Sequence, residues 1–350
     1  LHFVVVGLNI FIISYTFLIN SFNVMLIFLS FLEMRTYLKY INYCGYEQVA
    51  ASSVIPPISI LVPAYNEEKT VVETVRTLLN LEYPLFEIIV INDGSKDNTC
   101  RVLIDAYKMV PWAAVTCKQL PTEEIRGTYI SSIAPRLYLL DKVNGGKSDA
   151  LNAGINFSNY PYFLSMDADS SLEEESLKRI VRAIVENAQE VVGVGGMVRV
   201  LNGSLMSNGK VVKVALSRKP IVIFQVVEYL RAFLAGRIGL NKLNSLLIIS
   251  GAFGVFRKDI AIQVGGYRRE CIGEDMELVV RIQRFIRENN LNGRIVYLPD
   301  PVCWTQAPED IQSLKRQRNR WQRGLIQSLV IHKELLFNPK YRQLGLITIP

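Results

Sequence analysis

The chain has 350 residues, 50% of them hydrophobic, which suffices for one large α/β domain or two small ones. Its mean hydropathy of +0.21 is high for a wholly soluble protein, so part of the chain is expected to meet lipid. The formal net charge is +7, but no Lys/Arg block is interleaved with aromatic residues in the manner of a nucleic-acid-binding surface. We therefore expect no nucleic-acid partner, and a membrane surface or a diphosphate as the counter-charge.

Cysteine and histidine usage excludes several other kinds of site. The five cysteines are odd in number and lack C-x-x-C spacing, so neither a zinc site nor a disulfide framework is predicted, and a reducing cytosol fits. The two histidines, His2 and His332, argue against a His-based triad or a His-ligated metal. Proton transfer is therefore expected to fall to carboxylates.

Residues 1–34 form an apolar opening to the chain. No charged residue occurs from Leu1 to Leu32, and at about 1.5 Å per residue this run can cross a ~30 Å hydrocarbon core. We predict one long transmembrane span or two short ones broken near residues 20–23; a signal peptide is disfavoured because a basic start and a cleavage site are missing. Arg35 and Lys39 follow, which places the later domain on the cytoplasmic side of the cell membrane.

After a linker at residues 35–57, residues 58–310 show apolar runs that alternate with helical spacing. The pattern predicts a doubly wound, mostly parallel sheet with helices on both faces, whose ligands lie at the carboxyl ends of the strands. The predicted strands are 58–62, 87–91, 137–140, 162–166 and 191–200, and the predicted helices are 67–79, 148–155, 173–185, 220–234 and one starting at 97. Residues 116–136 are predicted as a long connection without an assigned function.

The most informative motif is Asp167-Ala168-Asp169, directly after an apolar strand. Two carboxylates at i and i+2 at a strand end can hold one hard divalent cation against a phosphate. A solvated acidic turn that caps a helix is the alternative for this motif alone. Two further polar motifs follow predicted strands, at residues 63–68 and 92–95.

Three sites lie beyond these strand ends. Gly273-Glu274-Asp275 precedes a helix, so its acids are either chemical groups or partners of the helix dipole. Residues 250–254, Ser-Gly-Ala-Phe-Gly, allow close approach of the backbone to a ligand, although packing explains them equally well.

The third site is an amphipathic segment, 311–337, with a helix predicted from Ile311 to Leu335. Gln317, Arg320 and Trp321 share one face of it by their i, i+3 and i+4 spacing. An indole beside a guanidinium suits a sugar ring next to a phosphate, and a solvated basic face is the alternative.

Gly145-Gly146-Lys147-Ser148 prompts comparison with a P-loop phosphotransferase. A Walker A loop needs glycine five positions before Gly146, where this chain has Asp141, so that match fails. Lys147 before a helix start remains a candidate phosphate contact. No G-x-G-x-x-G follows the first strand, which argues against a dinucleotide-binding oxidoreductase.

Taken in this order, the motifs resemble the membrane-embedded glycosyltransferases of family 2, the group that contains cellulose, chitin, hyaluronan and poly-N-acetylglucosamine synthases. The resemblance covers roughly residues 58–329 and implies a GT-A-like fold. It rests on the conjunction of Asp93, the Asp-x-Asp, the Glu-Asp pair and Q-x-x-R-W, which is more specific than any one of them.

The resemblance implies a role for each motif. The residues implied for the nucleotide of a UDP-sugar are Pro63, Ala64, Tyr65, Glu67, Asp93, Lys147 and Asp167. Asp167 and Asp169 are the implied ligands of Mg²⁺ or Mn²⁺, Asp169 being the better candidate for direct contact. Asp275 is the implied base, and Arg320 is implied to support the leaving diphosphate. Apart from the resemblance, Glu274 is expected to orient the base or to satisfy the start of the helix. The implied acceptor residues are Gln317, Trp321, Gly251, Ala252 and Phe253.

The expected reaction is an inverting, metal-dependent transfer. A cation and an arginine stabilise the leaving diphosphate. A carboxylate that takes the proton of the acceptor hydroxyl raises the rate of transfer by about 10² to 10⁴-fold. The expected donor is UDP-glucose or UDP-N-acetylglucosamine and the expected acceptor is a growing β-linked glycan at the membrane, with accessory export subunits as further partners. Single transfer to a lipid or protein stays open; a non-catalytic regulator would be expected to lack Asp169 or Asp275, and both are present.

Two departures stand out. Gly273 occupies a position where many relatives carry Thr, which puts local hydrogen bonding at the acidic pair in doubt. The chain starts at Leu1, not Met, and stops where residues 344–349 turn apolar, so residues 338–350 are expected to begin a further interface or membrane segment of a longer protein.

Overall fold

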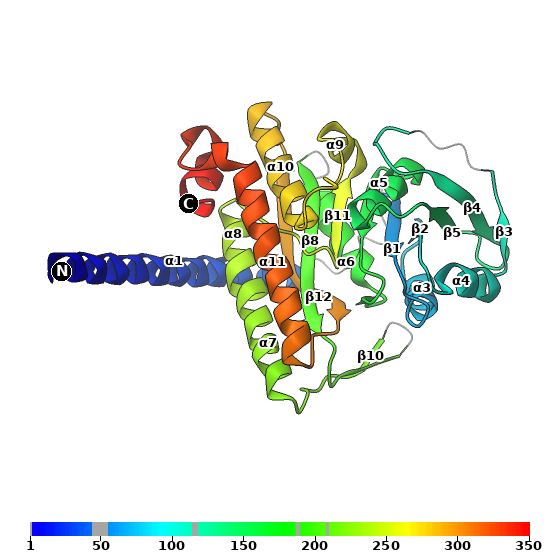
Figure 1. Cartoon of the computed structure of the whole chain (residues 1–350), viewed down its shortest axis with the longest axis horizontal. Coiled ribbons are helices and arrows are strands. Elements are labelled where there is room, and N and C mark those ends of the chain that lie inside the picture. Colours follow the sequence, from blue (N-terminus) through cyan, green and yellow to red (C-terminus); the bar gives the residue numbers. More distant parts are fainter. Residues whose placement is uncertain (1, 44–54, 114–117, 187–189, 208–209) are drawn as a thin grey trace.

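The computed structural model describes residues 2–43, 55–113, 118–186, 190–207 and 210–350. Part of the predicted linker, Cys44 and Cys117 lie outside these residues. Within them a ten-stranded sheet forms the centre of the molecule (Figure 1). Its strands are β1 (Ile58–Ala64), β2 (Phe86–Asp93), β3 (Met109–Pro111), β4 (Ile125–Ser131), β5 (Leu137–Lys142), β6 (Tyr162–Ser165), β7 (Ser171–Leu172), β8 (Val191–Val200), β11 (Gly254–Arg257) and β12 (Arg294–Thr305); β9 (Leu205–Ser207) and β10 (Lys210–Lys213) form a separate hairpin.

The strand order is β3-β4-β5-β2-β1-β6-β11-β8-β12-β7. The four strands β5, β2, β1 and β6 are parallel to one another, and β8 is parallel to β12. The strand β11 runs antiparallel between β6 and β8, so β8 and β12 point the same way as the central four. The predicted mostly parallel α/β sheet is therefore confirmed.

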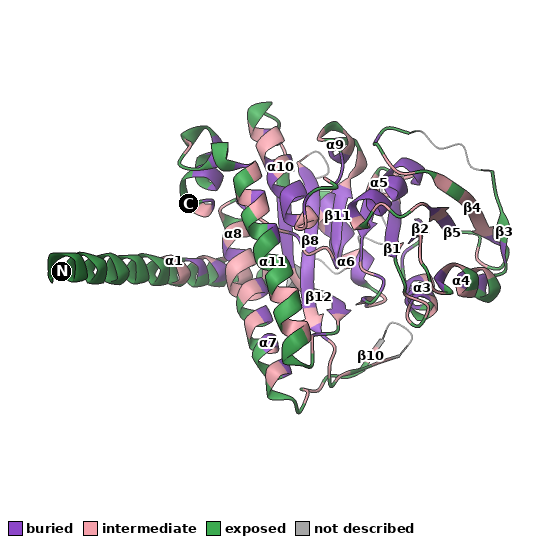
Figure 2. Ribbon diagram, in the orientation of Figure 1, coloured by how far each residue is buried: buried purple, intermediate pink, exposed green. Residues whose placement is uncertain are grey.

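The central strands are continuous apolar runs because both of their faces are covered. Every residue of β2 is buried, and Ile58, Ile60 and Leu61 of β1 are fully inaccessible to solvent. The main helices are α1 (His2–Tyr43), α3 (Val71–Leu79), α4 (Thr99–Tyr107), α5 (Lys147–Phe157), α6 (Ser176–Glu186), α7 (Pro220–Leu230), α8 (Ile238–Lys242), α9 (Lys258–Gln263), α10 (Glu274–Glu288) and α11 (Ile311–Ile331). Helix α5 packs on β1 and β2, and α6 packs on β8 and β12 (Figure 2).

The structure differs from two sequence-based predictions. Residues 125–131, predicted as part of a connection, form β4, which pairs antiparallel with β5 and β3. Its residues are mostly half-exposed and lack a clear alternation, so the strand signal in the sequence is weak. The predicted helix 220–234 is α7 followed by a π-helical segment, η1 (Arg231–Arg237).

At the start of the chain, the helix extends beyond the predicted span 1–34, and at the end short helical segments follow α11. Helix α1 is a single uninterrupted helix that continues to Tyr43, and it projects from the domain as a straight rod (Figure 1). The second half of α1 docks on the domain: Leu26 is buried against Gly239, and the Ser30 hydroxyl donates to the Leu234 carbonyl at 2.5 Å. After α11, η2 (Lys333–Leu335), η3 (Pro339–Tyr341) and η4 (Leu344–Thr348) are short 3₁₀ or π segments, and Leu344 is buried.

Candidate active site

The loops after β1 and β2 are fastened to each other. The backbone N–H of Asn66 donates to Ser95 Oγ at 3.0 Å, and Asn66 Oδ1 accepts from the Lys96 backbone at 2.8 Å. Asn66 has φ 58°, a left-handed conformation that asparagine tolerates better than most residues. The predicted nucleotide residues from Pro63 to Glu67 therefore lie beside the end of β2, with Tyr65 44% exposed.

Asp93, at the end of β2, is buried and binds the loop that leads to Lys147. Its Oδ1 accepts from the Gly145 backbone at 3.0 Å and its Oδ2 from the Gly146 backbone at 2.8 Å. Oδ1 also lies 2.6 Å from Nζ of Lys142. Asp93 thus orders the start of α5, and its predicted contact with a uridine stays a prediction.

Lys142 and Asp149 form a buried pair that the sequence reasoning missed. Both side chains are fully buried, and Nζ of Lys142 lies 2.6 Å from Oδ1 of Asp149 as well as from Asp93. Asp149 also pairs with Arg269. A charged residue at the end of the apolar strand 137–142 was the available signal in the sequence. Because buried charges are retained only where they are paired, this network fixes the loop between β5 and α5.

Lys147 lies between acids from two different parts of the chain. Its Nζ is 2.5 Å from Asp167 Oδ1 and 3.2 Å from Glu274 Oε1. Burial by itself lowers the pKa of Lys147, but the charges of Asp167 and Glu274 outweigh it, so the lysine pKa is raised. Lys147 is therefore a firmly charged ammonium that joins the Asp-x-Asp to the Glu-Asp pair.

Asp169 is the more exposed member of the Asp-x-Asp pair, since Asp167 is half-buried. The pKa of Asp169 is raised, first by partial desolvation of its carboxylate and then by the negative charges of Asp167 and Glu67. Neighbouring carboxylates at the end of a strand can coordinate a divalent cation. Mg²⁺ is usually coordinated by one or two protein carboxylates together with phosphates of the substrate. In the described parts of the chain, no group of three or more acidic, His or Cys side chains forms a complete metal site.

Asp275 is the second residue of α10 and faces the segment before β11. Its Oδ2 accepts from the Gly251 backbone at 3.0 Å, and its Oδ1 accepts from the Met276 backbone at 2.8 Å. A Cβ atom at Gly251 would lie 3.0 Å from Nζ of Lys147, so glycine leaves the room that these side chains occupy. Of the other two residues predicted to contact an acceptor here, Ala252 is 7% exposed and Phe253 is fully buried.

Helix α11 presents Trp321 next to aromatic and basic side chains. Trp321 is 42% exposed, its ring lies 6.4 Å from that of Tyr229 in α7, and the Arg318 guanidinium lies 4.3 Å from the indole centroid. Arg318 is held by Glu228 at 2.5 Å. Arg320 is exposed, whereas Gln317 has a buried Oε1 without a hydrogen-bond partner. Tyr229 and Arg318 thus lie beside Trp321, which is one of the predicted acceptor residues.

The start of α10 contacts α11 through two glycines. A Cβ atom on Gly273 would lie 3.0 Å from the Gly324 backbone, and one on Gly324 would lie 2.8 Å from the Gly273 backbone. No side chain fits between the two backbones. Glycine at position 273, where many relatives carry threonine, is therefore compatible with the close contact between α10 and α11.

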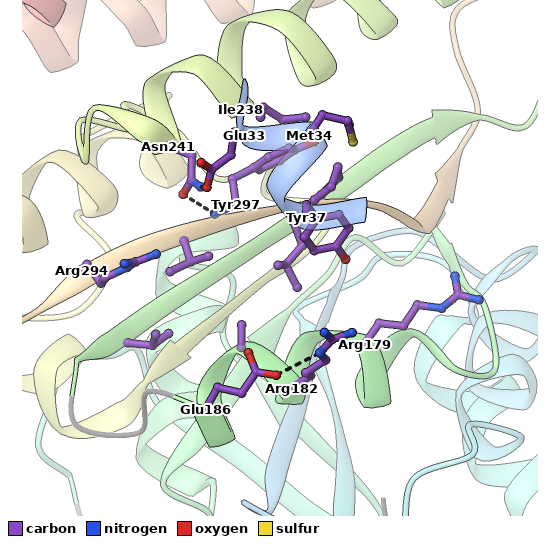
Figure 3. A pocket seen from close by; sticks show the side chains of 15 residues that line it. Glu33, Met34, Tyr37, Arg179, Arg182, Glu186, Ile238, Asn241, Arg294 and Tyr297 are labelled. Carbon is purple, nitrogen blue, oxygen red and sulfur yellow. Dashed lines mark hydrogen bonds and ion pairs between the residues drawn. The ribbon is translucent and has the colours of Figure 1, made fainter. Parts of the chain in front are cut away.

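A cavity of about 150 Å³ lies elsewhere, between the end of α1, helix α6 and β12 (Figure 3). Tyr37 and Glu33 of α1, Arg182 of α6 and Tyr297 of β12 line it. Arg182 pairs with Glu186 at 3.0 Å, and Asn241 accepts from the Tyr297 backbone at 2.9 Å. None of the predicted site residues lines this cavity.

Residues 134–324 match the sequence family described as "Glycosyltransferase like family 2", and residues 59–112 match "Glycosyl transferase family 2". The first match covers more than half of the chain. The chain belongs to glycosyltransferase family 2.

Two curated relatives and one solved structure are similar to this chain. Poly-beta-1,6-N-acetyl-D-glucosamine synthase of Staphylococcus epidermidis is 30% identical over 267 residues, which are 76% of this chain and 54% of that protein. The probable glycosyltransferase YdaM of Bacillus subtilis is 28% identical over 272 residues, 77% of this chain and 55% of that protein. The chain thus spans about half the length of the curated relatives it matches.

The solved structure is that of the mannosyltransferase PcManGT from Pyrobaculum calidifontis, in complex with GDP-Man and Mn²⁺. It superimposes with a TM-score of 0.58 at 16% identity, covering 93% of this chain and 79% of that chain. At this identity the likeness bears on the fold alone, and it agrees with the GT-A-like architecture expected for a family 2 glycosyltransferase.

Proposed function

We propose that this chain is the catalytic part of a membrane-bound glycosyltransferase that moves a sugar from a UDP-sugar to the end of a growing β-linked glycan, with inversion at the anomeric carbon. The observation that carries the proposal is the position of Lys147, which joins Asp167 on one side to Glu274 on the other. A phosphate-binding cation thereby lies between the acids assigned to the metal and the acids assigned to proton transfer.

The donor half of the site is assigned to the ends of β1, β2 and β6. Residues 63–67 and Asp93 are proposed to hold the uridine, and Lys147 the diphosphate. Asp167 and Asp169 are proposed to hold Mg²⁺ or Mn²⁺, which when bound supplies Lewis-acid stabilisation of the leaving diphosphate. Desolvation and then the negative charges of Asp167 and Glu67 raise the Asp169 pKa, and these charges support the assignment because a divalent cation would offset them.

The acceptor half is assigned to α10 and α11. Asp275 is proposed to take the proton of the attacking hydroxyl, while Glu274 restrains Lys147 and Arg320 supports the leaving group. The two backbone hydrogen bonds to Asp275 support this role because they hold a carboxylate in one orientation. Trp321 and Gln317 are proposed to contact the acceptor sugar, the exposed indole offering a face for stacking.

N-acetylglucosamine is the proposed sugar. The similarity to the Staphylococcus epidermidis poly-beta-1,6-N-acetyl-D-glucosamine synthase supports it over glucose, which was left open by the sequence. The alternative is transfer of a single sugar to a lipid or protein.

A membrane location is supported by the surface of α1. Residues His2–Lys39 are long and apolar enough to span a bilayer, and large side chains such as Phe3 and Phe17 are exposed. Helices α7 and α11 run across the direction of α1 (Figure 1), with Phe224 and Val330 exposed on them. We propose that α1 spans the membrane, that α7 and α11 lie along its cytoplasmic surface, and that accessory export subunits assemble beside them.

The test is UDP release and product size from the full-length protein in nanodiscs with Mn²⁺, comparing UDP-N-acetylglucosamine with UDP-glucose. Long product from UDP-N-acetylglucosamine, lost in Asp275→Asn, is the expected result. Product that stops at one added sugar would replace the polymer proposal with the single-transfer alternative. Absence of turnover with either donor would contradict the proposed function.

A further inference from the structure

Glu228 of α7 and Arg318 of α11 form an ion pair that uses none of the predicted site residues. Nη2 of Arg318 lies 2.5 Å from Oε2 of Glu228, where the two helices run side by side (Figure 1). Both side chains are partly exposed. An ion pair that water reaches adds little to stability, so its loss is expected to leave the fold intact. The effect of the pair on function depends on what Arg318 contacts next.

Arg318 covers one face of the Trp321 indole. The central carbon of its guanidinium lies over the ring, 4.3 Å from the centroid. The two residues are three positions apart on α11, so their side chains leave the helix on the same side. An indole face attracts a guanidinium, and Glu228 holds this guanidinium from α7. Glu228, Arg318 and Trp321 thus form a continuous line of contacts from α7 to the indole.

Tyr229, which follows Glu228 in α7, also lies against the indole. Its ring centroid is 6.4 Å from that of Trp321 and 5.6 Å from that of Phe233. Tyr229 and Phe233 are both buried, so Tyr229 is a fixed neighbour, whereas Trp321 is exposed. The part of the indole that these neighbours leave uncovered is the part on which a sugar ring can stack.

We propose that Glu228 and Arg318 are positioning residues that hold Trp321 in the orientation in which it stacks on a sugar ring of the acceptor glycan. The inference rests on the proposed function, in which Trp321 contacts the acceptor. A side chain that is ordered before binding loses little rotamer freedom when the ligand arrives, so the affinity for that ligand is higher. Because Arg318 occupies one face of the indole, the acceptor sugar stacks on the other face. The pair therefore sets the affinity for the acceptor and leaves donor binding unchanged.

The first experiment measures steady-state kinetics of the full chain in nanodiscs, with a β-1,6-linked N-acetylglucosamine oligosaccharide as the acceptor. In Arg318→Met and in Glu228→Gln, KM for the oligosaccharide is expected to rise by about threefold to tenfold, the effect of ordering one side chain on binding, with KM for the UDP-sugar unchanged. The double variant should lose no more than Arg318→Met alone, because Glu228 acts through Arg318.

Lys219→Met is the matched control. It removes a second 2.5 Å pair, with Glu309, which also joins the start of α7 to the residues just before α11. This variant should leave KM for the oligosaccharide in place. An unchanged KM in Arg318→Met or Glu228→Gln, additive losses in the double variant, or an equal rise in Lys219→Met would overturn the proposal.

The second experiment is independent of turnover. Tryptophan fluorescence is followed while the same oligosaccharide is added in the presence of UDP, and the part of the signal that Trp321→Phe removes reports on Trp321. Arg318→Met should weaken the affinity by the same factor as it raises KM. Equal affinity in Arg318→Met, or absence of binding to the unaltered protein, overturns the inference whatever the activity. Arg318-dependent binding in a protein without turnover would retain the inference and remove only the proposed transfer reaction.

Discussion

Nζ of Lys147 lies 2.5 Å from Oδ1 of Asp167, so the lysine occupies an oxygen of the acid that is assigned to the divalent cation. Under the proposed function, a divalent cation held by Asp167 would compete with this ammonium for one carboxylate. A metal–nucleotide complex bound here under the same proposal would draw Lys147 from Asp167 towards the diphosphate.

Replacement of this lysine is expected to have opposite effects on the two ligands. Lys147→Met should strengthen Mn²⁺ binding in the absence of nucleotide, because Asp167 is freed, and should weaken UDP binding by about tenfold to a hundredfold, the range of one charge-assisted hydrogen bond. Calorimetric titrations measure both. Lys178→Met, which removes the 2.5 Å pair with Glu82 away from the site, should change neither. Parallel losses of both affinities in Lys147→Met would contradict the competition.

Asp169 is expected to limit stability when it is charged. Its raised pKa means that the folded protein binds this proton more tightly than the unfolded chain, so stability falls as pH rises above the ordinary range of an aspartic acid. Asp169→Asn should therefore raise the melting temperature at neutral pH without metal, and should abolish the further rise on adding Mn²⁺. Melting curves with and without Mn²⁺ test both statements, and a Mn²⁺-induced rise that persists would place the metal elsewhere.

The two acids of the Glu-Asp pair are expected to differ in effect. Asp275→Asn should lower kcat by about 10² to 10⁴-fold, the usual contribution of a general base, and leave UDP affinity nearly unchanged. Glu274→Gln should instead raise KM for the donor, because Glu274 Oε1 lies 3.2 Å from Lys147 and not at the transferred proton. Steady-state kinetics separate the two. Equal kcat losses in both variants would leave the base unassigned between them.

Gly251 is expected to tolerate no side chain without loss of function. Its Cβ would lie 3.0 Å from the flexible end of Lys147 and 3.5 Å from Oδ2 of Asp275, so Gly251→Ala should fold and displace the lysine. We expect a several-fold rise in KM for the UDP-sugar. Gly7→Ala, where nothing lies within 4 Å of the added atom, is the control. Wild-type kinetics in Gly251→Ala would show that Lys147 adjusts freely.

Restoring the threonine of many relatives is expected to harm this particular chain. Gly273→Thr would place a side chain against the Gly324 backbone, 3.0 Å away, and should lower the free energy of unfolding by about 1–3 kcal/mol, the usual cost of overpacking. Thermal or denaturant unfolding measures the change. Gly236→Ala, whose added atom meets only the Arg231 carbonyl at 3.9 Å, should be neutral. A stable Gly273→Thr variant would show that α11 shifts readily.

The sequence predicted the position of those site residues that directly follow continuous apolar strands. The continuous hydrophobic stretches of β1, β2 and β6 located the loops that hold Glu67, Asp93 and Asp167, because buried parallel strands leave no ambiguity in their pattern. The pairing of Lys142 with Asp93 was not predictable, since the two residues lie 49 positions apart along the chain and nothing in local spacing joins them. The strand β4 was missed because its half-exposed residues show no period.

The Gly273–Gly324 contact has a mechanical consequence. Since backbone touches backbone there, the spacing between the start of α10 and the middle of α11 is independent of any side-chain rotamer. Trp321 lies less than one helical turn from Gly324, and Asp275 lies two residues from Gly273. The contact therefore fixes the separation between the backbone at Trp321 and the backbone at Asp275. In an enzyme that lengthens a glycan, a fixed separation would return the end of the glycan and the base to the same distance after every addition.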